Sequence, residues 1–170
     1  MSNLPLLALT ELRALLGEHL STTAAIRAEH AQSETHVVAA APDAVCFPQR
    51  TSEVAEIAKI CARHGVPMIG WGQGTSLEGH ALAAQGGLTL DFRLMDKILS
   101  LHPEDMRVRV QPGITRERLN QELRETGLFF PVDPGANASL GGMASTRASG
   151  TTTVRYGSMR ANVLGLEVVL

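Results

Sequence analysis

The sequence predicts an α+β fold, in which short helices and short strands follow one another irregularly along the chain. Three observations predict it: apolar residues recur at helical spacing in several segments, other short segments are apolar enough to be strands, and two glycine-rich loops interrupt them. The chain has 170 residues, 44% of them hydrophobic and 19% charged, a composition typical of a globular domain with a real core.

Two segments in the first half of the chain have the apolar spacing of an amphipathic helix. The first runs from Leu4 to Gly17, where the glycine can end it. The second begins at Thr51 or Ser52, either of which can cap it, and runs through Arg63. The apolar faces are made by Leu9, Leu12, Leu15 and Leu16 in the first helix and by Val54, Ile57, Ala58 and Cys61 in the second.

The second half of the chain predicts two further helices. Thr115 can cap a helix that runs through Thr126, with Leu119 and Leu123 facing inward. A shorter helix is expected at residues 140–145, inside the second glycine-rich loop region.

Short apolar segments predict the strands, and the alternation of Arg107–Val110 suits a strand that is buried on one face. The last segment, Val163–Leu170, reads as a strand that belongs inside a sheet, yet neither a turn nor a polar tail follows it. We therefore expect the chain to be the front part of a longer polypeptide. The predicted strands are Val37–Ala40, Val66–Ile69, Leu88–Phe92, Ile98–Leu101, Arg107–Val110 and Val163–Leu170.

Charge and cysteine content exclude several classes of function. The net charge is −2, and the basic residues are scattered, so the chain has no positive field for nucleic acid. Cys46 and Cys61 have no zinc-finger spacing, which favours a reduced, cytoplasmic chain with two buried thiols. The first twenty residues lack the pattern of a secretory signal, and no apolar run is long enough to span a membrane.

The first glycine-rich loop, Gly70–Gly79, is suited to bring bare backbone close to a ligand. Glycine accepts positive φ, so that successive amides can converge on phosphate oxygens, and Thr75 and Ser76 add hydroxyl donors. The loop does not open into a helix, as the dinucleotide fingerprint of the doubly wound fold requires, and it lacks the Lys-Ser/Thr of a nucleoside-triphosphate loop. Taken alone, it fits a structural turn as well as a ligand site.

The second loop, Asp133–Ala144, contains small residues almost throughout. Within it, Pro134–Gly135 and Gly141–Gly142 bracket a run of small residues in which Leu140 is the one bulky side chain. A tight linker between two subdomains would explain this composition, but such density of small residues favours a flat or extended ligand that passes close to the backbone. Together the loops predict a cofactor with a diphosphate.

In this order, these segments resemble the flavin-binding domain of FAD-linked 2-hydroxy-acid oxidoreductases in the vanillyl-alcohol-oxidase (PCMH-type) superfamily. Within it, the chain is most similar to the branch of D-lactate dehydrogenase (cytochrome) and the glycolate oxidase flavoprotein subunit. The resemblance covers residues 26–170 and is most specific in the last third. The residues that carry it are Pro42–Pro48, Gly72–Gly79, Asp91–Met95, Val110–Gly113 and Leu128–Leu170, with the strings Phe129–Gly135 and Arg147–Thr151 inside the last.

The resemblance implies a PCMH-type FAD-binding domain of two α/β subdomains at residues 41–170, incomplete at its C-terminus, after a helical and connecting segment at residues 1–40. The first loop would wrap the FAD diphosphate, and the second would run along the ribityl chain and the isoalloxazine edge. The cofactor-binding residues expected are Gly72, Gln73, Gly74, Thr75, Ser76, Leu77, Pro134, Gly135, Ser139, Gly141, Gly142, Ala144, Ser149, Gly150, Tyr156 and Gly157.

The same resemblance implies that FAD is bound non-covalently. Family members with a histidyl link carry that histidine in the first loop, where this chain has Thr75 and Ser76. His80 is then a surface or supporting histidine, and Trp71 either packs near the adenine or fills the core. Arg147 and Arg155 either neutralise anionic ligand groups or are ordinary surface arginines. The spacing of His30, Glu34 and His36 resembles a metal site only superficially.

The family oxidises the C2 hydroxyl of a D-2-hydroxy acid to a keto acid by hydride transfer to FAD, and D-lactate is the substrate we expect. Its general base, substrate-binding arginines and metal-ligating histidines come from later parts of the protein, so no catalytic residue and no metal ligand are expected here. Two alternatives remain: a non-catalytic remnant or split subunit that binds FAD only when a partner chain completes it, and the flavin domain of a cell-wall reductase. The strings Phe129–Gly135 and Arg147–Thr151 argue against the reductase. The electron acceptor is not predicted, and a peripheral association with a membrane is compatible with the cytoplasmic location.

Overall fold

A computed structural model describes residues 4–38 and 40–170 of the chain. It confirms the α+β class and divides the chain into two compact units. The first contains the residues up to Leu94 together with Val168–Leu170, and the second contains Met95–Glu167. Each unit has its own hydrophobic core.

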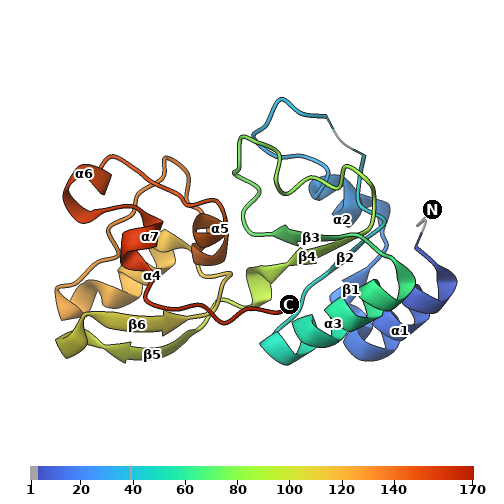
Figure 1. Cartoon of the computed structure of the whole chain (residues 1–170), viewed down its shortest axis with the longest axis horizontal. Helices are drawn as coiled ribbons and strands as arrows, with labels where there is room; N and C mark the ends of the chain where they lie inside the picture. The colour runs from blue at the N-terminus through green and yellow to red at the C-terminus, as the bar shows by residue number, and fades with distance from the viewer. Residues whose placement is uncertain (1–3, 39) are drawn as a thin grey trace. The chain divides into compact units, whose positions relative to one another are not determined.

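The first unit is built on a four-stranded sheet with the order β1-β2-β4-β3 (Figure 1). Strands β2 (Ala44–Cys46), β4 (Leu88–Asp91) and β3 (Met68–Trp71) are parallel, and the short β1 (Leu20–Ser21) pairs antiparallel with β2. Because the carboxyl ends of parallel strands meet at one edge of a sheet, the residues that follow β3 and β4 are brought together there.

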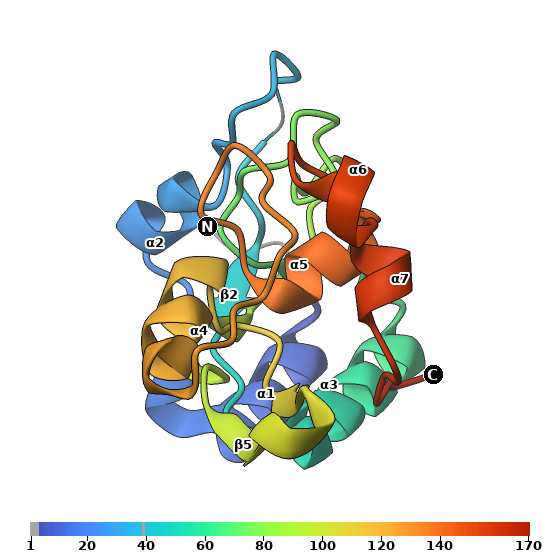
Figure 2. The same ribbon diagram turned by 90° about the vertical axis from the view of Figure 1, so that its left-hand side faces the viewer.

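The two faces of this sheet carry different residues. Leu88 and Leu90 of β4 join a core with α1 (Leu6–Leu16) and α3 (Thr51–His64), whereas the alternate residues of β4 face the other way. Figures 1 and 2 show α1 and α3 side by side, and Figure 1 shows α2 (Ala24–Glu29) on the opposite face of the sheet. A short 3-10 turn, Gly17–His19, leads from α1 into β1.

The second unit contains an antiparallel hairpin of β5 (Ile98–His102) and β6 (Arg107–Val110), joined by the 3-10 turn Pro103–Asp105. Apolar side chains of the hairpin pack against the core of this unit, which includes Leu119 and Leu123 of the following helix. The helices are α4 (Arg116–Leu123), which continues as a 3-10 turn at Arg124–Thr126, α5 (Leu140–Ser145), α6 (Thr153–Tyr156) and α7 (Met159–Asn162).

Most predicted elements are confirmed within two residues of their bounds, including the cap of α4, where the Thr115 hydroxyl accepts from the Arg118 amide. The predicted cap of α3 was wrong. Its N-cap is Arg50 in an extended conformation, and no side chain caps it. Instead, Glu53 in the first turn accepts a hydrogen bond from the Gln49 amide at 2.8 Å and pairs with Arg50.

Two predicted strands were also wrong. Val37 and Val38 lie in no strand and are exposed, and residue 39 lies outside the described residues. Val163–Leu170 has no strand structure, and Leu164, Leu166, Val168 and Leu170 are exposed. A strand needs a hydrogen-bonded neighbour, and no part of the described chain pairs with either segment. The weak pattern of residues 22–48 also concealed α2.

The proposed division at residue 40 stays a prediction. Within the first unit α1 packs against α3, so the N-terminal helix and the sheet that follows share one core. Among residues 4–38 and 40–170, no helix combines the length and the apolar character needed to cross a membrane.

Candidate functional site

The first two residues of the first glycine-rich loop, Gly70 and Trp71, end β3, so the loop leaves the parallel sheet at its carboxyl edge. Gly74 has a φ of 67°, the left-handed conformation that glycine adopts without strain. In the described parts of the chain, no atom accepts a hydrogen bond from the backbone amides of residues 73–77. These amides are therefore free to donate to an anionic ligand, and their contact with one stays a prediction.

A hollow of about 560 Å³ lies beside this loop, a volume within the usual range for a small-molecule site. The loop forms one wall, and the residues after α2 form another. The lining residues are Glu29, Gln32, Ser33, Glu34, Trp71, Gly72, Gln73, Gly74 and Arg93.

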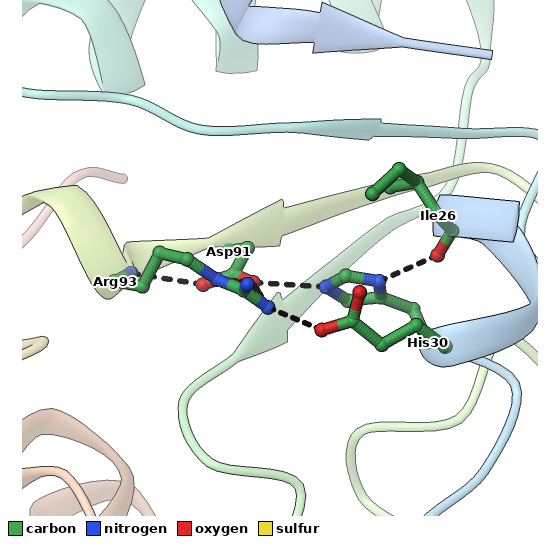
Figure 3. A network of polar contacts seen from close by, with 5 residues as sticks. Ile26, His30, Asp91 and Arg93 are labelled. Carbon is green, nitrogen blue, oxygen red and sulfur yellow. Dashed lines mark hydrogen bonds and ion pairs between the residues drawn. The ribbon is translucent and has the colours of Figure 1, made fainter. Parts of the chain in front are cut away.

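An ionic network borders this hollow through Glu29 and Arg93. Figure 3 shows the network, whose buried part is the pair of His30 and Asp91. His30, just after α2, and Asp91, the last residue of β4, have no exposed surface. His30 Nε2 lies 2.9 Å from Asp91 Oδ2, and His30 Nδ1 lies 2.8 Å from the Ile26 carbonyl oxygen. Arg93 donates its amide to Asp91 Oδ1 at 2.8 Å and its Nε to Asp91 Oδ2 at 2.6 Å, and it also pairs with Glu29.

The geometry favours a charged network. Both ring nitrogens of His30 face oxygen atoms, an arrangement that suits the imidazolium form, in which both nitrogens donate. Burial acts to lower the pKa of His30, but the hydrogen bonds to Asp91 and to the Ile26 carbonyl outweigh burial and raise it. Burial acts to raise the pKa of Asp91, but the hydrogen bonds from His30 and Arg93 outweigh it and lower the pKa. Both shifts favour the charged form of the group, an imidazolium facing a carboxylate.

Trp71 links the network to the loop. Its ring centroid lies 4.7 Å from that of His30, and its side chain is buried. A Cβ on Gly74 would lie 2.5 Å from Trp71 Cζ2, so the loop backbone rests directly on the indole. Of the two interpretations of Trp71, the structure favours the core.

The second loop leads into α5 in the other unit. Buried Ser139 caps that helix by accepting from the Gly142 amide, and the Gly141 amide donates to the Pro112 carbonyl at 2.8 Å. The amides of Gly135 and Ala136 donate to no described atom. Backbone donors for a ligand are thus concentrated at the start of the loop rather than at the paired glycines.

Asp133, at the start of the second loop, is hydrogen-bonded to Thr151 and Thr152, and we call this set of contacts the Asp133 closure. The Thr151 hydroxyl donates to Asp133 Oδ2 at 2.7 Å, and the Thr152 amide donates to Oδ1 at 3.0 Å. The hydrogen bond from Thr151, together with those from Thr152, lowers the pKa of Asp133 to about 2. A Cβ on Gly150 would lie 2.2 Å from the Asp133 carbonyl oxygen, so this closure requires glycine at position 150.

Two predicted site residues, Tyr156 and Gly157, come next in the chain after the threonines that bind Asp133. Tyr156 ends α6 and meets Phe129 edge to face, with ring centroids 5.5 Å apart, and Gly157 next to it has a φ of 82°. Arg155 lies over the Tyr156 ring, 5.3 Å from its centroid. Arg147 is exposed and has a φ of 52°, which is uncommon for a residue with a side chain.

The structure brings the predicted residues together in two groups. The six of the first loop lie in the first unit, and the ten from Pro134 onward lie in the second. Contact of either group with a cofactor stays a prediction. Sequence reasoning missed the His30–Asp91–Arg93 network and the Asp133 closure, although Asp91 and Arg93 lay inside a segment that carried the resemblance. His30 is not placed as a metal ligand, because both of its nitrogens are engaged within the protein.

Comparison with known proteins points in one direction. Residues 42–170 match a family described as FAD binding domain. A probable mitochondrial D-lactate dehydrogenase of Danio rerio is 52% identical over 153 residues, which is 90% of this chain and 31% of that protein. A mitochondrial D-lactate dehydrogenase (cytochrome) of Arabidopsis thaliana is 46% identical over 164 residues, which is 95% of this chain and 29% of that protein. The chain thus spans about a third of the length of these relatives.

A more distant relative and a solved structure agree with this. A glycolate oxidase subunit of Bacillus subtilis is 38% identical over 131 residues, covering 76% of this chain and 28% of that protein. The structure of an alkyldihydroxyacetonephosphate synthase superposes on 94% of this chain and 32% of its own, with a TM-score of 0.83 and 24% identity. This second similarity concerns the fold alone.

Proposed function

The chain belongs to the family of FAD-binding domains, and from this premise we propose that it is the FAD-binding portion of an oxidoreductase that converts a D-2-hydroxy acid, D-lactate above all, to the 2-keto acid. The observation that carries the proposal is the match of residues 42–170 together with relatives at 52% and 46% identity whose names specify D-lactate dehydrogenase. The substrate is the part taken from those names.

The residues of this chain fit such a cofactor. The free amides of residues 73–77 would receive the diphosphate, and the absence of a Cβ at Gly74 lets the loop backbone rest on the Trp71 indole in its left-handed conformation. The side-chain-poor segment from Pro134 to Ala144, with Ser149, Gly150, Tyr156 and Gly157, would lie along the rest of the cofactor. When bound, FAD supplies a two-electron acceptor for the hydride. We propose that it is held non-covalently.

The binding experiment uses the purified chain and three ligands. FAD should co-elute with the chain in gel filtration and should be released into the supernatant by acid precipitation, as expected without a covalent bond. Riboflavin, which lacks the diphosphate that the amides of residues 73–77 would receive, should bind much more weakly, and FMN should lie between them. Equal binding of FAD and riboflavin would contradict a diphosphate-binding role for the loop.

The substrate experiment uses the full-length protein. Anaerobic addition of D-lactate should bleach the flavin absorbance, whereas L-lactate should not, and glycolate tests the alternative suggested by the Bacillus subtilis relative. Absence of bleaching by every D-2-hydroxy acid would refute the proposed reaction while leaving cofactor binding intact.

The partners and the location complete the proposal. The exposed apolar side chains of residues 163–170 support pairing of this segment with a strand from another part of the protein or from another chain. The electron acceptor is left unassigned. We propose that the protein is cytoplasmic, either free or peripherally associated with a membrane. Because the names of two relatives place those proteins in mitochondria, cell fractionation is the direct test.

A further inference from the structure

We propose that His30 is the positioning residue of the first glycine loop: as an imidazolium between Asp91 and the Ile26 carbonyl, it holds Trp71 beneath Gly74 and so fixes the backbone of residues 72–77 in its anion-accepting shape. This inference rests on the proposed function only for the identity of the anion, which is the FAD diphosphate. The mechanical part rests on contacts within the first unit.

The contact chain from His30 to the loop has two links. The His30 and Trp71 rings are tilted by 55° with centroids 4.7 Å apart, and a Cβ on Gly74 would overlap the six-membered ring of that indole. A separate bond joins the same region, since the Glu34 amide donates to the Gly74 carbonyl at 3.4 Å. A shift of His30 therefore moves the support of Gly74 directly.

The positive charge of His30 keeps its ring, and with it Trp71, in place. The charged groups around His30 are Asp91 and Arg93 from the end of β4 and Glu29, the last residue of α2, so two cations face two anions. Cys46 of β2 lies near Asp91, and burial raises the pKa of its thiol, so it stays uncharged. Loss of the His30 proton would point a nitrogen lone pair at the Ile26 carbonyl or at Asp91, and it would leave a net negative charge beside an anion-binding loop.

Trp71 is the one tryptophan in the sequence, so its fluorescence reports this contact without any cofactor. A neighbouring imidazolium quenches indole emission more strongly than a neutral imidazole does. Emission should therefore rise with pH, with a midpoint above the ordinary histidine value of about 6.5. The step should disappear in His30→Gln and persist in His102→Gln, which changes a partly exposed histidine of the other unit. A step that survives in His30→Gln, or no step in the wild type, overturns the proposal.

A second pair of variants tests the link from Trp71 to the loop. Gly74 and Gly65 both have left-handed backbone, with φ values of 67° and 64°, but a Cβ on Gly65 meets nothing within 4 Å. Both alanine variants carry the same backbone strain, so only Gly74→Ala should change the Trp71 emission and its pH step. Identical behaviour of the two variants would show that the indole does not support the loop.

Titration with FAD then tests whether the protonation of His30 affects the binding of the ligand. Wild-type affinity should fall about fivefold or more across the emission step, a typical size for a coupling between sites, whereas His30→Gln should bind more weakly with no such pH dependence. If the emission step is present but FAD does not bind at any pH, the proposed function fails and the positioning role stands. If FAD binds with an affinity that ignores the step, the positioning role fails and the proposed function stands.

Discussion

Single residues in both loops are constrained by neighbours within their own unit as well as by any ligand. Gly141 lies against Pro112, where a Cβ would come within 2.6 Å of the proline ring, and Gly150 lies against Asp133. The packing alone thus explains why these positions lack side chains. At Gly141 and Gly150, a residue with a side chain would force the backbone to move. The glycines therefore determine the backbone conformation that a ligand would contact.

Gly150→Ala should destabilise the protein by about 2–3 kcal/mol, because its Cβ would collide with the Asp133 carbonyl and with the Asp133 carboxylate, which Thr151 and Thr152 hold in place. Gly135→Ala is the matched control: its Cβ meets nothing within 4 Å, so the change should stay within about 0.5 kcal/mol. Urea unfolding followed by circular dichroism measures both. Equal destabilisation by the two variants would show that the Asp133 closure contributes nothing.

The residue pattern predicted where the loops are but not what supports them. Glycine, serine and threonine mark a tight turn through local chemistry, which a sequence displays directly. The bond between His30 and Asp91 joins residues 61 positions apart, and nothing in the local spacing of either residue indicates the other. The spacing of His30, Glu34 and His36 resembles a metal site only superficially, and the partners of His30 are a carboxylate and a helix carbonyl.

At the scale of elements, the extended segment before the second loop is attached to α4 by one side chain. Asn120 donates through Nδ2 to the Phe130 carbonyl at 3.2 Å and accepts from the Phe130 amide at 2.6 Å through Oδ1. The amide group thus satisfies both backbone groups of a residue that has no strand partner. It sets the position from which the loop starts.

Asn120→Ala should lower the free energy of unfolding by about 1–3 kcal/mol, because both backbone groups of partly buried Phe130 lose their partner. Hydrogen exchange should accelerate at the Phe130 amide in particular. Gln121→Ala removes an exposed amide from the next position of the same helix and should change stability by less than about 0.5 kcal/mol. Unchanged exchange at Phe130 in Asn120→Ala would contradict this attachment.

Elements were predictable where their determinants are local. Thr115 caps α4 through a bond to a residue three positions away, and the alternation of Arg107–Val110 fits a hairpin with a short turn. Val163–Leu170 has an equally apolar sequence but no strand, because pairing depends on a neighbour that the pattern cannot supply. For α3, the starting residue was predicted correctly but the cap was not. An ion pair of Arg50 with Glu53 is found there in place of the expected hydroxyl cap.

At the scale of the whole molecule, the ionised side chains define the pH range in which the structure is stable. A bond to His64 lowers the pKa of Glu11 between α1 and α3, hydrogen bonds lower that of Asp91 despite its burial, and the closure of the second loop lowers that of Asp133 to about 2. A carboxylate with a lowered pKa contributes stability above its unfolded value and loses it as the pH falls through its folded value. His30, with a raised pKa, contributes below its unfolded value, and its contribution declines as the pH rises toward its folded value.

Urea midpoints should therefore be nearly constant between about pH 4 and pH 6.5 and should decrease on both sides of that range. On the acid side, Asp133→Asn should lower the midpoint near neutral pH and weaken its dependence on pH below 4, because one of the carboxylates that must be protonated is gone. Asp105→Asn, on the exposed turn between β5 and β6, should leave the acid dependence unchanged. An acid dependence of Asp133→Asn equal to that of the wild type would mean that the second loop remains closed without its carboxylate, and that its shape depends on Gly150 and the threonines alone.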